Sequence, residues 1–91
     1  MFLSDELNKI FDEGGFTPEV TMKLLQACIN RLPSREETAR MAPSAFLTRL
    51  KQIDNAWRLF CKKHTEYKVN GWRNWVLRSD TTGKFKKALN W

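Results

Sequence analysis

The longest apolar pattern in the chain runs through residues 45–64. Side chains with apolar or ring character recur there at intervals of four and three residues, at Phe46, Leu50, Ile53, Trp57, Phe60 and His64. This spacing places them on one face of an α-helix, and Leu47 and Cys61 widen that face. We therefore expect a long helix over 45–64 that is packed along its length, with Ser44 as its N-cap.

A first helix is expected to begin at Ser4, within the segment 4–32. Asp5 and Glu6 follow this serine. The hydroxyl can cap free amides, and the two acids favour the positive end of the helix dipole. Gly14-Gly15 is expected to end the helix, because glycine adopts the left-handed conformation that a C-cap requires.

A second helix is expected to begin at Thr17-Pro18-Glu19, where a capping threonine precedes a proline at the first helical position. Pro33 ends it. Its apolar residues cover much of its circumference: Val20, Leu24, Leu25, Ala27, Cys28, Ile29 and Leu32. A helix that is apolar on so many sides is expected to be the central one.

Shorter helices are expected on both sides of the long one. Ser34, with Glu37 three residues later, forms a capping box that opens a short helix closed by Pro43. After the long helix, residues 65–69 form an expected polar link, and Asn70 caps a helix that runs to about Arg78. The final stretch, 84–91, can add one or two helical turns.

No segment alternates apolar and polar residues over five or more positions, so no strand is expected. The predicted fold is all-α, a bundle of about four to five helices in a single domain over residues 1–91. Its acidic helices occupy 4–32, and a basic, aromatic half occupies 34–91.

Charge divides the chain in the same way. Residues 1–30 carry two Lys/Arg against five Asp/Glu, and residues 31–91 carry fourteen against five. This asymmetry indicates an anionic partner for the C-terminal half. The alternative is that the basic charge serves solubility and pairs with the acidic N-terminal helix.

Targeting and membrane segments are not expected. No apolar run approaches the ~20 residues of a membrane span, and the N-terminus lacks the basic and apolar regions of a signal peptide. Two cysteines, Cys28 and Cys61, are too few for a disulfide framework and are expected to be reduced and buried. We therefore expect a soluble, cytoplasmic protein.

Catalytic and metal-binding patterns are weak. The single histidine, His64, ends the long apolar face and is expected to favour the C-terminal end of the helix dipole. Cys28, Cys61 and His64 fall short of the four ligands that structural zinc prefers. The glycines lack the lysine and spacing of a phosphate-binding loop. We expect no enzyme activity, no metal and no cofactor.

The C-terminal third interleaves cations with aromatic rings, a pairing that binds single-stranded nucleic acid through phosphate contacts and base stacking. Trp57, Phe60 and Trp75 are expected in the core. Tyr67 and Trp72 lie in or beside the polar link, so exposed stacking and core burial both remain open for them. The candidate nucleic-acid-binding residues are Lys62, Lys63, Tyr67, Lys68, Trp72, Arg73 and Arg78.

A resemblance to a known family supports this assignment. Trp57-Arg58-Leu59-Phe60, Lys62-Lys63-His64 and Trp72-Arg73-Asn74-Trp75-Val76 together resemble the C-terminal motif of phage and plasmid replication proteins of the DnaT and DnaD type. The resemblance implies binding of single-stranded DNA and a role in loading a replicative helicase. The matching residues are Lys62, Lys63, Trp72, Arg73 and Trp75. The first helix of the motif departs from the family in having Cys61 beside Phe60, and residues 1–45 show no counterpart.

Two alternatives stand beside single-stranded DNA binding. In a helix-turn-helix, the helix after Asn70 would instead enter the major groove with Arg73, Asn74 and Arg78. A small regulator or inhibitor encoded by a phage would use the same residues to dock on a host protein, because interfaces are also rich in Trp, Tyr and Arg.

Overall fold

The computed structural model describes residues 2–79 and 83 of the chain. Its elements are α1 (Leu3–Gly14), α2 (Pro18–Asn30), α3 (Arg35–Arg40), α4 (Pro43–Lys63), the 3₁₀ helix η1 (Thr65–Tyr67) and α5 (Trp72–Ser79). The described residues contain no strand, so the all-α prediction is confirmed. The helical turns expected over 84–91 lie outside the described residues.

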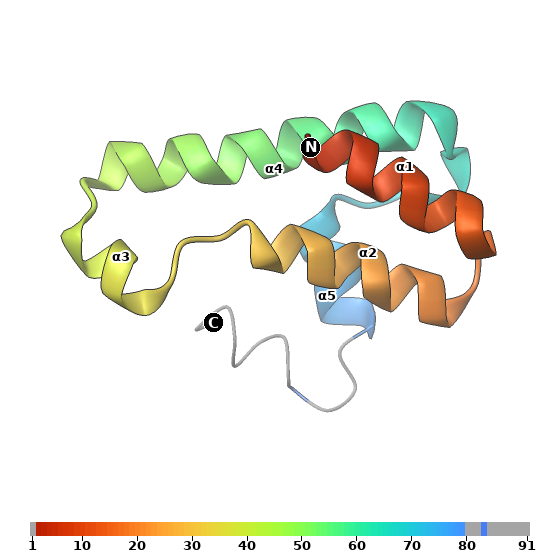
Figure 1. Cartoon of the computed structure of the whole chain (residues 1–91), viewed down its shortest axis with the longest axis horizontal. Coiled ribbons are helices and arrows are strands. Elements are labelled where there is room, and N and C mark those ends of the chain that lie inside the picture. The colour runs from red at the N-terminus through yellow and green to blue at the C-terminus, as the bar shows by residue number, and fades with distance from the viewer. Residues whose placement is uncertain (1, 80–82, 84–91) are drawn as a thin grey trace.

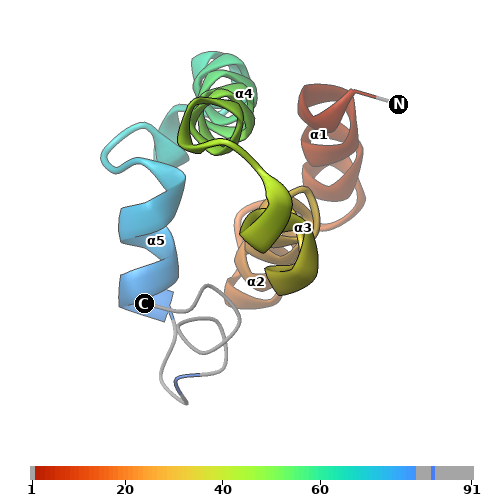
Figure 2. The same cartoon turned by 90° about the vertical axis from the view of Figure 1, so that its left-hand side faces the viewer.

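The long helix α4 forms one side of the molecule (Figure 1), with α1 packed between α4 and α2 and α5 packed against α2. Viewed along α4, helices α1 and α5 lie on opposite sides of it, and α2 lies across the interior from it (Figure 2). The short helix α3 connects α2 to the N-terminal end of α4 and contributes no buried residue. The core therefore lies between α1, α2, α4 and α5.

Two of the predicted caps are confirmed by hydrogen bonds. The Thr17 side-chain oxygen accepts a hydrogen bond from the Val20 amide at 3.1 Å, and Pro18 occupies the first turn of α2. The Ser34 hydroxyl accepts one from the Glu37 amide at 3.1 Å. Gly15 ends α1 with a φ of 75°, a left-handed value that a residue with a Cβ rarely adopts.

Three helix starts differ from the prediction. α1 begins at Leu3, so Ser4 lies inside it, and α4 begins at Pro43 with Ala42 as N-cap, so Ser44 is not its cap. The first turn of a helix leaves its amides unpaired, so a proline, which has no amide hydrogen, is well suited to begin α4 rather than to end α3.

α5 also begins later than predicted, at Trp72. Its first hydrogen bond runs from the Trp75 amide to the Gly71 carbonyl, not to Asn70.

The apolar face of α4 is confirmed over most of its length. Ile53, Trp57 and Phe60 are buried, as is Cys61 beside them, whereas Phe46 and Leu50 are half-buried. Leu47 is 54% exposed and does not widen the face as expected. The N-terminal half of α4 extends past α1, so it has fewer helices to pack against (Figure 1).

Residues 65–69 are not the purely polar link that the sequence suggested. Thr65–Tyr67 fold into η1, which turns the Tyr67 side chain inward until none of it is exposed, whereas Lys68 and Val69 remain exposed. Its ring lies with centroids 5.0–6.1 Å from those of Phe11, Phe16, Trp57, Phe60 and Trp75. Burying so large a ring stabilises the fold by about 1.5–3 kcal/mol.

The Tyr67 hydroxyl has a partner inside the core. It lies 2.6 Å from the Thr21 side-chain oxygen, on α2. Thr21 donates its own hydroxyl hydrogen to the Thr17 carbonyl at 2.9 Å. Tyr67 must therefore be the donor and Thr21 the acceptor in the bond between them.

Removal of this hydroxyl in Tyr67→Phe is expected to lower the free energy of unfolding by about 1 kcal/mol, because a buried hydrogen bond is lost. Urea denaturation measures the change. In a Thr21→Val background the same substitution is expected to cost clearly less, since the bond is already absent. Thr38→Val is the matched control, because Thr38 makes the same bond to a carbonyl four residues back but is exposed. Equal costs of Tyr67→Phe in both backgrounds would show that the bond contributes nothing.

Candidate nucleic-acid interface

A groove of about 520 Å³ lies between α4 and the segment that joins η1 to α5. The described residues that line it are Asp54, Trp57, Arg58, Cys61, Lys62, Lys68, Val69, Asn70, Gly71 and Trp72. Arg58 and Lys62 lie one helical turn apart on α4, and Lys68 comes from the other wall. All three cations are exposed. The fold thus brings residues from both sides of η1 into one basic site.

The wall that carries Lys68 is fixed by donors from the core. The Trp57 indole donates to the Asn70 carbonyl and the Trp75 indole to the Tyr67 carbonyl, each at 3.2 Å. The Cys61 thiol also donates to the Tyr67 carbonyl, at 3.4 Å. These bonds hold the backbone on both sides of Lys68, so the lysine is presented from an ordered turn.

Trp72 belongs to the interior, not to the surface that the sequence allowed for it. Its side chain is 1% exposed, and its indole donates to the Asp54 carboxylate at 2.6 Å. Arg73 forms a 3.2 Å ion pair with the other oxygen of Asp54 and lies over the Trp72 ring. Both oxygens of this carboxylate are therefore bonded within the chain.

The sequence left open whether Tyr67 and Trp72 are exposed for base stacking or buried, and in this fold both are buried. Each ring is buried and each polar atom has a partner on another helix, Thr21 for the hydroxyl and Asp54 for the indole. The residue that sequence reasoning missed is Asp54, for which the sequence carries one weak signal. This aspartate borders the apolar face of α4, one turn from Arg58 and less than one turn from Trp57, where a carboxylate needs a donor.

The seven predicted contact residues do not all share one site. Lys62, Lys68 and Trp72 line the groove. Arg73 does not line it but forms an ion pair with Asp54, which does. Lys63 is exposed at the end of α4 but does not line the groove. Arg78 lies at a different hollow, with Phe16 and Trp75. The seven residues predicted from the sequence do not include two that line the groove. Arg58 is one of the cations interleaved with aromatic rings, and Asn70 was expected only to cap a helix.

The basic character continues along α4. Lys51, Arg58 and Lys62 are spaced seven and four residues apart and are exposed, so they form one row on the helix. The row spans roughly 16 Å at the rise of an α-helix. We call Lys51, Arg58 and Lys62 the basic row, and Lys68 lies across the groove from it.

Two buried nitrogen atoms beside the groove have no hydrogen-bond partner among the residues that the structure describes. They are Nδ2 of Asn70, a lining residue, and Nε of Arg73. Both are donors, and buried donors in folded proteins nearly always find an acceptor. The three groove cations favour a ligand that supplies oxygen acceptors and negative charge.

The other polar residues considered from the sequence have structural partners. His64 follows the last residue of α4, and its Nε2 lies 3.1 Å from the Asn8 side-chain oxygen. Its ring packs against Phe11, with centroids 4.0 Å apart. Over residues 2–79 and 83, no three His, Cys, Asp or Glu side chains gather into a metal-binding group.

Both cysteines are buried and have no disulfide bond. Burial raises the pKa of the Cys61 thiol from its ordinary value of 9.0 to about 11. Burial, with a smaller effect from Glu6, also raises the pKa of Cys28. Both thiols therefore hold their protons more tightly in the folded chain than in the unfolded chain.

Among the described helices, none is both long enough and apolar enough to cross a lipid bilayer. No protein-family model matches the chain, and no curated protein or solved structure shows a significant match to it.

The raised thiol pKa values predict a loss of stability in alkali. Between pH 9 and pH 11 the unfolded chain releases the Cys61 proton and the folded chain keeps it, so the unfolding free energy falls as pH rises. Urea denaturation with reductant is expected to show this fall, and Cys61→Ala to reduce its slope. A Cys61→Ala protein with the wild-type slope would contradict the assignment.

Proposed function

We propose that this chain is a non-catalytic nucleic-acid-binding module that holds the phosphate backbone in the groove between α4 and α5. One observation carries the proposal. Arg58, Lys62 and Lys68 converge on a groove in which the one carboxylate among the described lining residues, Asp54, is already bonded to Trp72 and Arg73. The groove therefore presents unneutralised positive charge.

The dimensions of the basic row agree with a strand of nucleic acid. Successive phosphates of one strand advance about 3.4 Å along a duplex axis, so a row of roughly 16 Å can follow about four or five of them. Lysine and arginine contacts to phosphate release condensed counterions, which makes this kind of binding strong at low salt and weak at high salt.

The buried rings change the kind of recognition that we expect. Single-stranded DNA was favoured because Tyr67 and Trp72 could stack on bases, and both are buried. Contacts to phosphates alone carry no sequence information and do not require unpaired bases. We therefore propose binding through the backbone, with similar affinity for single and double strands. The resemblance to replication proteins of the DnaT and DnaD type makes single-stranded DNA the first ligand to test.

Loss of one phosphate-binding charge should flatten the salt dependence. For Lys62→Ala and Lys68→Ala we expect weaker binding to every sequence and a salt slope lower by about one unit per lysine. Fluorescence anisotropy with labelled single- and double-stranded DNA measures both effects. Lys9→Ala is the matched control, because Lys9 is equally exposed but lies on α1, on the other side of α4.

Three results would contradict the proposal. The first is a wild-type protein that binds neither DNA nor RNA at low salt. The second is an equal loss of affinity in Lys9→Ala, which would mean that only overall charge matters. The third is a wild-type salt slope that Lys62→Ala and Lys68→Ala leave unchanged.

Asp54→Asn should act in the opposite direction. The amide oxygen can still accept from the Trp72 indole, but the negative charge is removed and Arg73 loses its ion pair. We expect tighter binding of DNA and a steeper salt slope, measured in the same anisotropy assay. A thermal melt monitors folding. Weaker binding by a folded Asp54→Asn protein would show that phosphate does not occupy this groove.

A further inference from the structure

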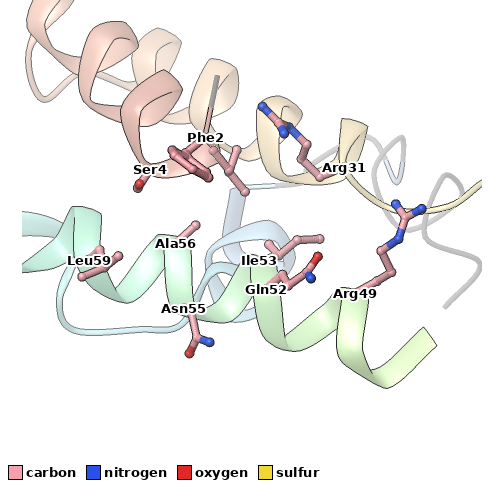
Figure 3. Close-up of a pocket in the computed structure, with 10 residues that line it drawn as sticks. Phe2, Ser4, Arg31, Arg49, Gln52, Ile53, Asn55, Ala56 and Leu59 are labelled. Atoms are coloured by element: carbon pink, nitrogen blue, oxygen red, sulfur yellow. The ribbon is translucent and has the colours of Figure 1, made fainter. Parts of the chain in front are cut away.

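A second groove lies on the other side of α4, where α1 begins and α2 ends (Figure 3). It encloses about 630 Å³, and the described residues that line it are Phe2, Leu3, Ser4, Arg31, Arg49, Gln52, Ile53, Asn55, Ala56 and Leu59. Leu3, Ile53 and Ala56 are buried and form its floor. At its rim, Phe2 is 78% exposed and Leu59 is 54% exposed. Apolar side chains that gather at a groove in this way are typical of an interaction site.

The charge at this groove has one sign. Arg31 and Arg49 are the charged members of the described lining, which contains no Asp or Glu. Arg31 donates to Glu6 at 2.9 Å, whereas Arg49 makes no hydrogen bond or ion pair within the described part of the chain. Figure 3 shows Arg49 at one end of the groove and Leu59 at the other. The groove thus has a basic end and an apolar end.

We propose that this groove binds a short amphipathic helix of another protein, with apolar side chains over Ile53, Ala56 and Leu59 and a carboxylate against Arg49. From Arg49 to Leu59 the groove follows about 15 Å of α4, the length of roughly three helical turns. The small side chains of Ser4 and Ala56 allow close approach between helices. Docking of an amphipathic helix into an apolar groove is a common mode of peptide recognition.

A second copy of this chain is a poorer occupant. Its acidic helix is α1, and the apolar side chains of that helix already serve its own core, because Leu3 and Leu7 are buried there and Ile10 and Phe11 pack against it. The exposed positions of α1 include Asp5, Asp12 and Glu13, which would place charge over an apolar floor. A separate partner with both an apolar stripe and an acidic end satisfies the groove better.

The probe for this site is a displayed library of helical peptides about three turns long, selected on the wild-type protein. Enriched peptides are expected to carry apolar residues at helical spacing and Asp or Glu at one end. Their affinity, measured by anisotropy, should fall about tenfold or more in Leu59→Glu, because the substitution places a charge against the apolar stripe of the peptide. It should fall less in Arg49→Gln, and this smaller loss should disappear at high salt.

Leu77→Glu is the matched control, because Leu77 is 47% exposed but lies on α5. Three outcomes would overturn the proposal: a library that yields no binder, binders that lack acidic residues, or binders that Leu59→Glu and Leu77→Glu weaken equally. Dimerisation of the wild-type chain in sedimentation, abolished by Leu59→Glu, would instead assign the groove to a second copy. Lys62→Ala is expected to leave peptide binding unchanged, because Lys62 lines the other groove. A failure of the peptide-binding proposal can therefore be distinguished from a failure of the nucleic-acid proposal.

Discussion

The burial of Tyr67 is the interaction on which the rest of the structure depends. Its hydroxyl bonds to Thr21, forty-six positions earlier in the chain, and its carbonyl accepts from Cys61 and Trp75. One residue of η1 therefore joins α2, α4 and α5, and its ring meets side chains from α1 and the α1–α2 turn. Together with the bonds from Trp57 to the Asn70 carbonyl and from Trp72 to Asp54, this residue sets the direction in which the chain leaves α4 and enters α5.

The burial of Tyr67 also explains why the basic groove presents cations while the aromatic rings lie in the interior. Turning Tyr67 inward places its neighbour Lys68 outward, and the indoles of Trp57 and Trp75 are drawn to backbone carbonyls around that turn. The alternation of rings and cations along the sequence thus separates into an aromatic interior and a cationic surface. An amphipathic fold and a stacking surface produce the same sequence pattern, and they differ only in which face the rings occupy.

Sequence periodicity predicted the long helix and most of its buried face, because helical spacing is a local property that Ile53, Trp57 and Phe60 carry together. The caps at Thr17 and Ser34 could be predicted for the same reason, since a capping side chain bonds to an amide only three residues away. The prediction that Pro43 closes the short helix was wrong, because a proline can end one helix or open the next. Tyr67, Trp72 and Asp54 could not be placed because their partners lie 18 to 46 residues away. Among the predicted cations, Lys62 and Lys68 line the groove, whereas the ion pair between Asp54 and Arg73 depends on the tertiary fold.

The two grooves give α4 a different chemistry on each side. Arg58 and Lys62 face the groove toward α5, and Ala56 and Leu59 face the groove toward α1, because successive positions on a helix are rotated by about 100°. Trp57 and Phe60 are buried between these faces, so the part of α4 that separates the two sites is anchored in the core. If both proposed ligands bind, a rigid helix fixes the distance between them. The chain would then hold a partner protein at high effective concentration beside a nucleic acid without any change of shape.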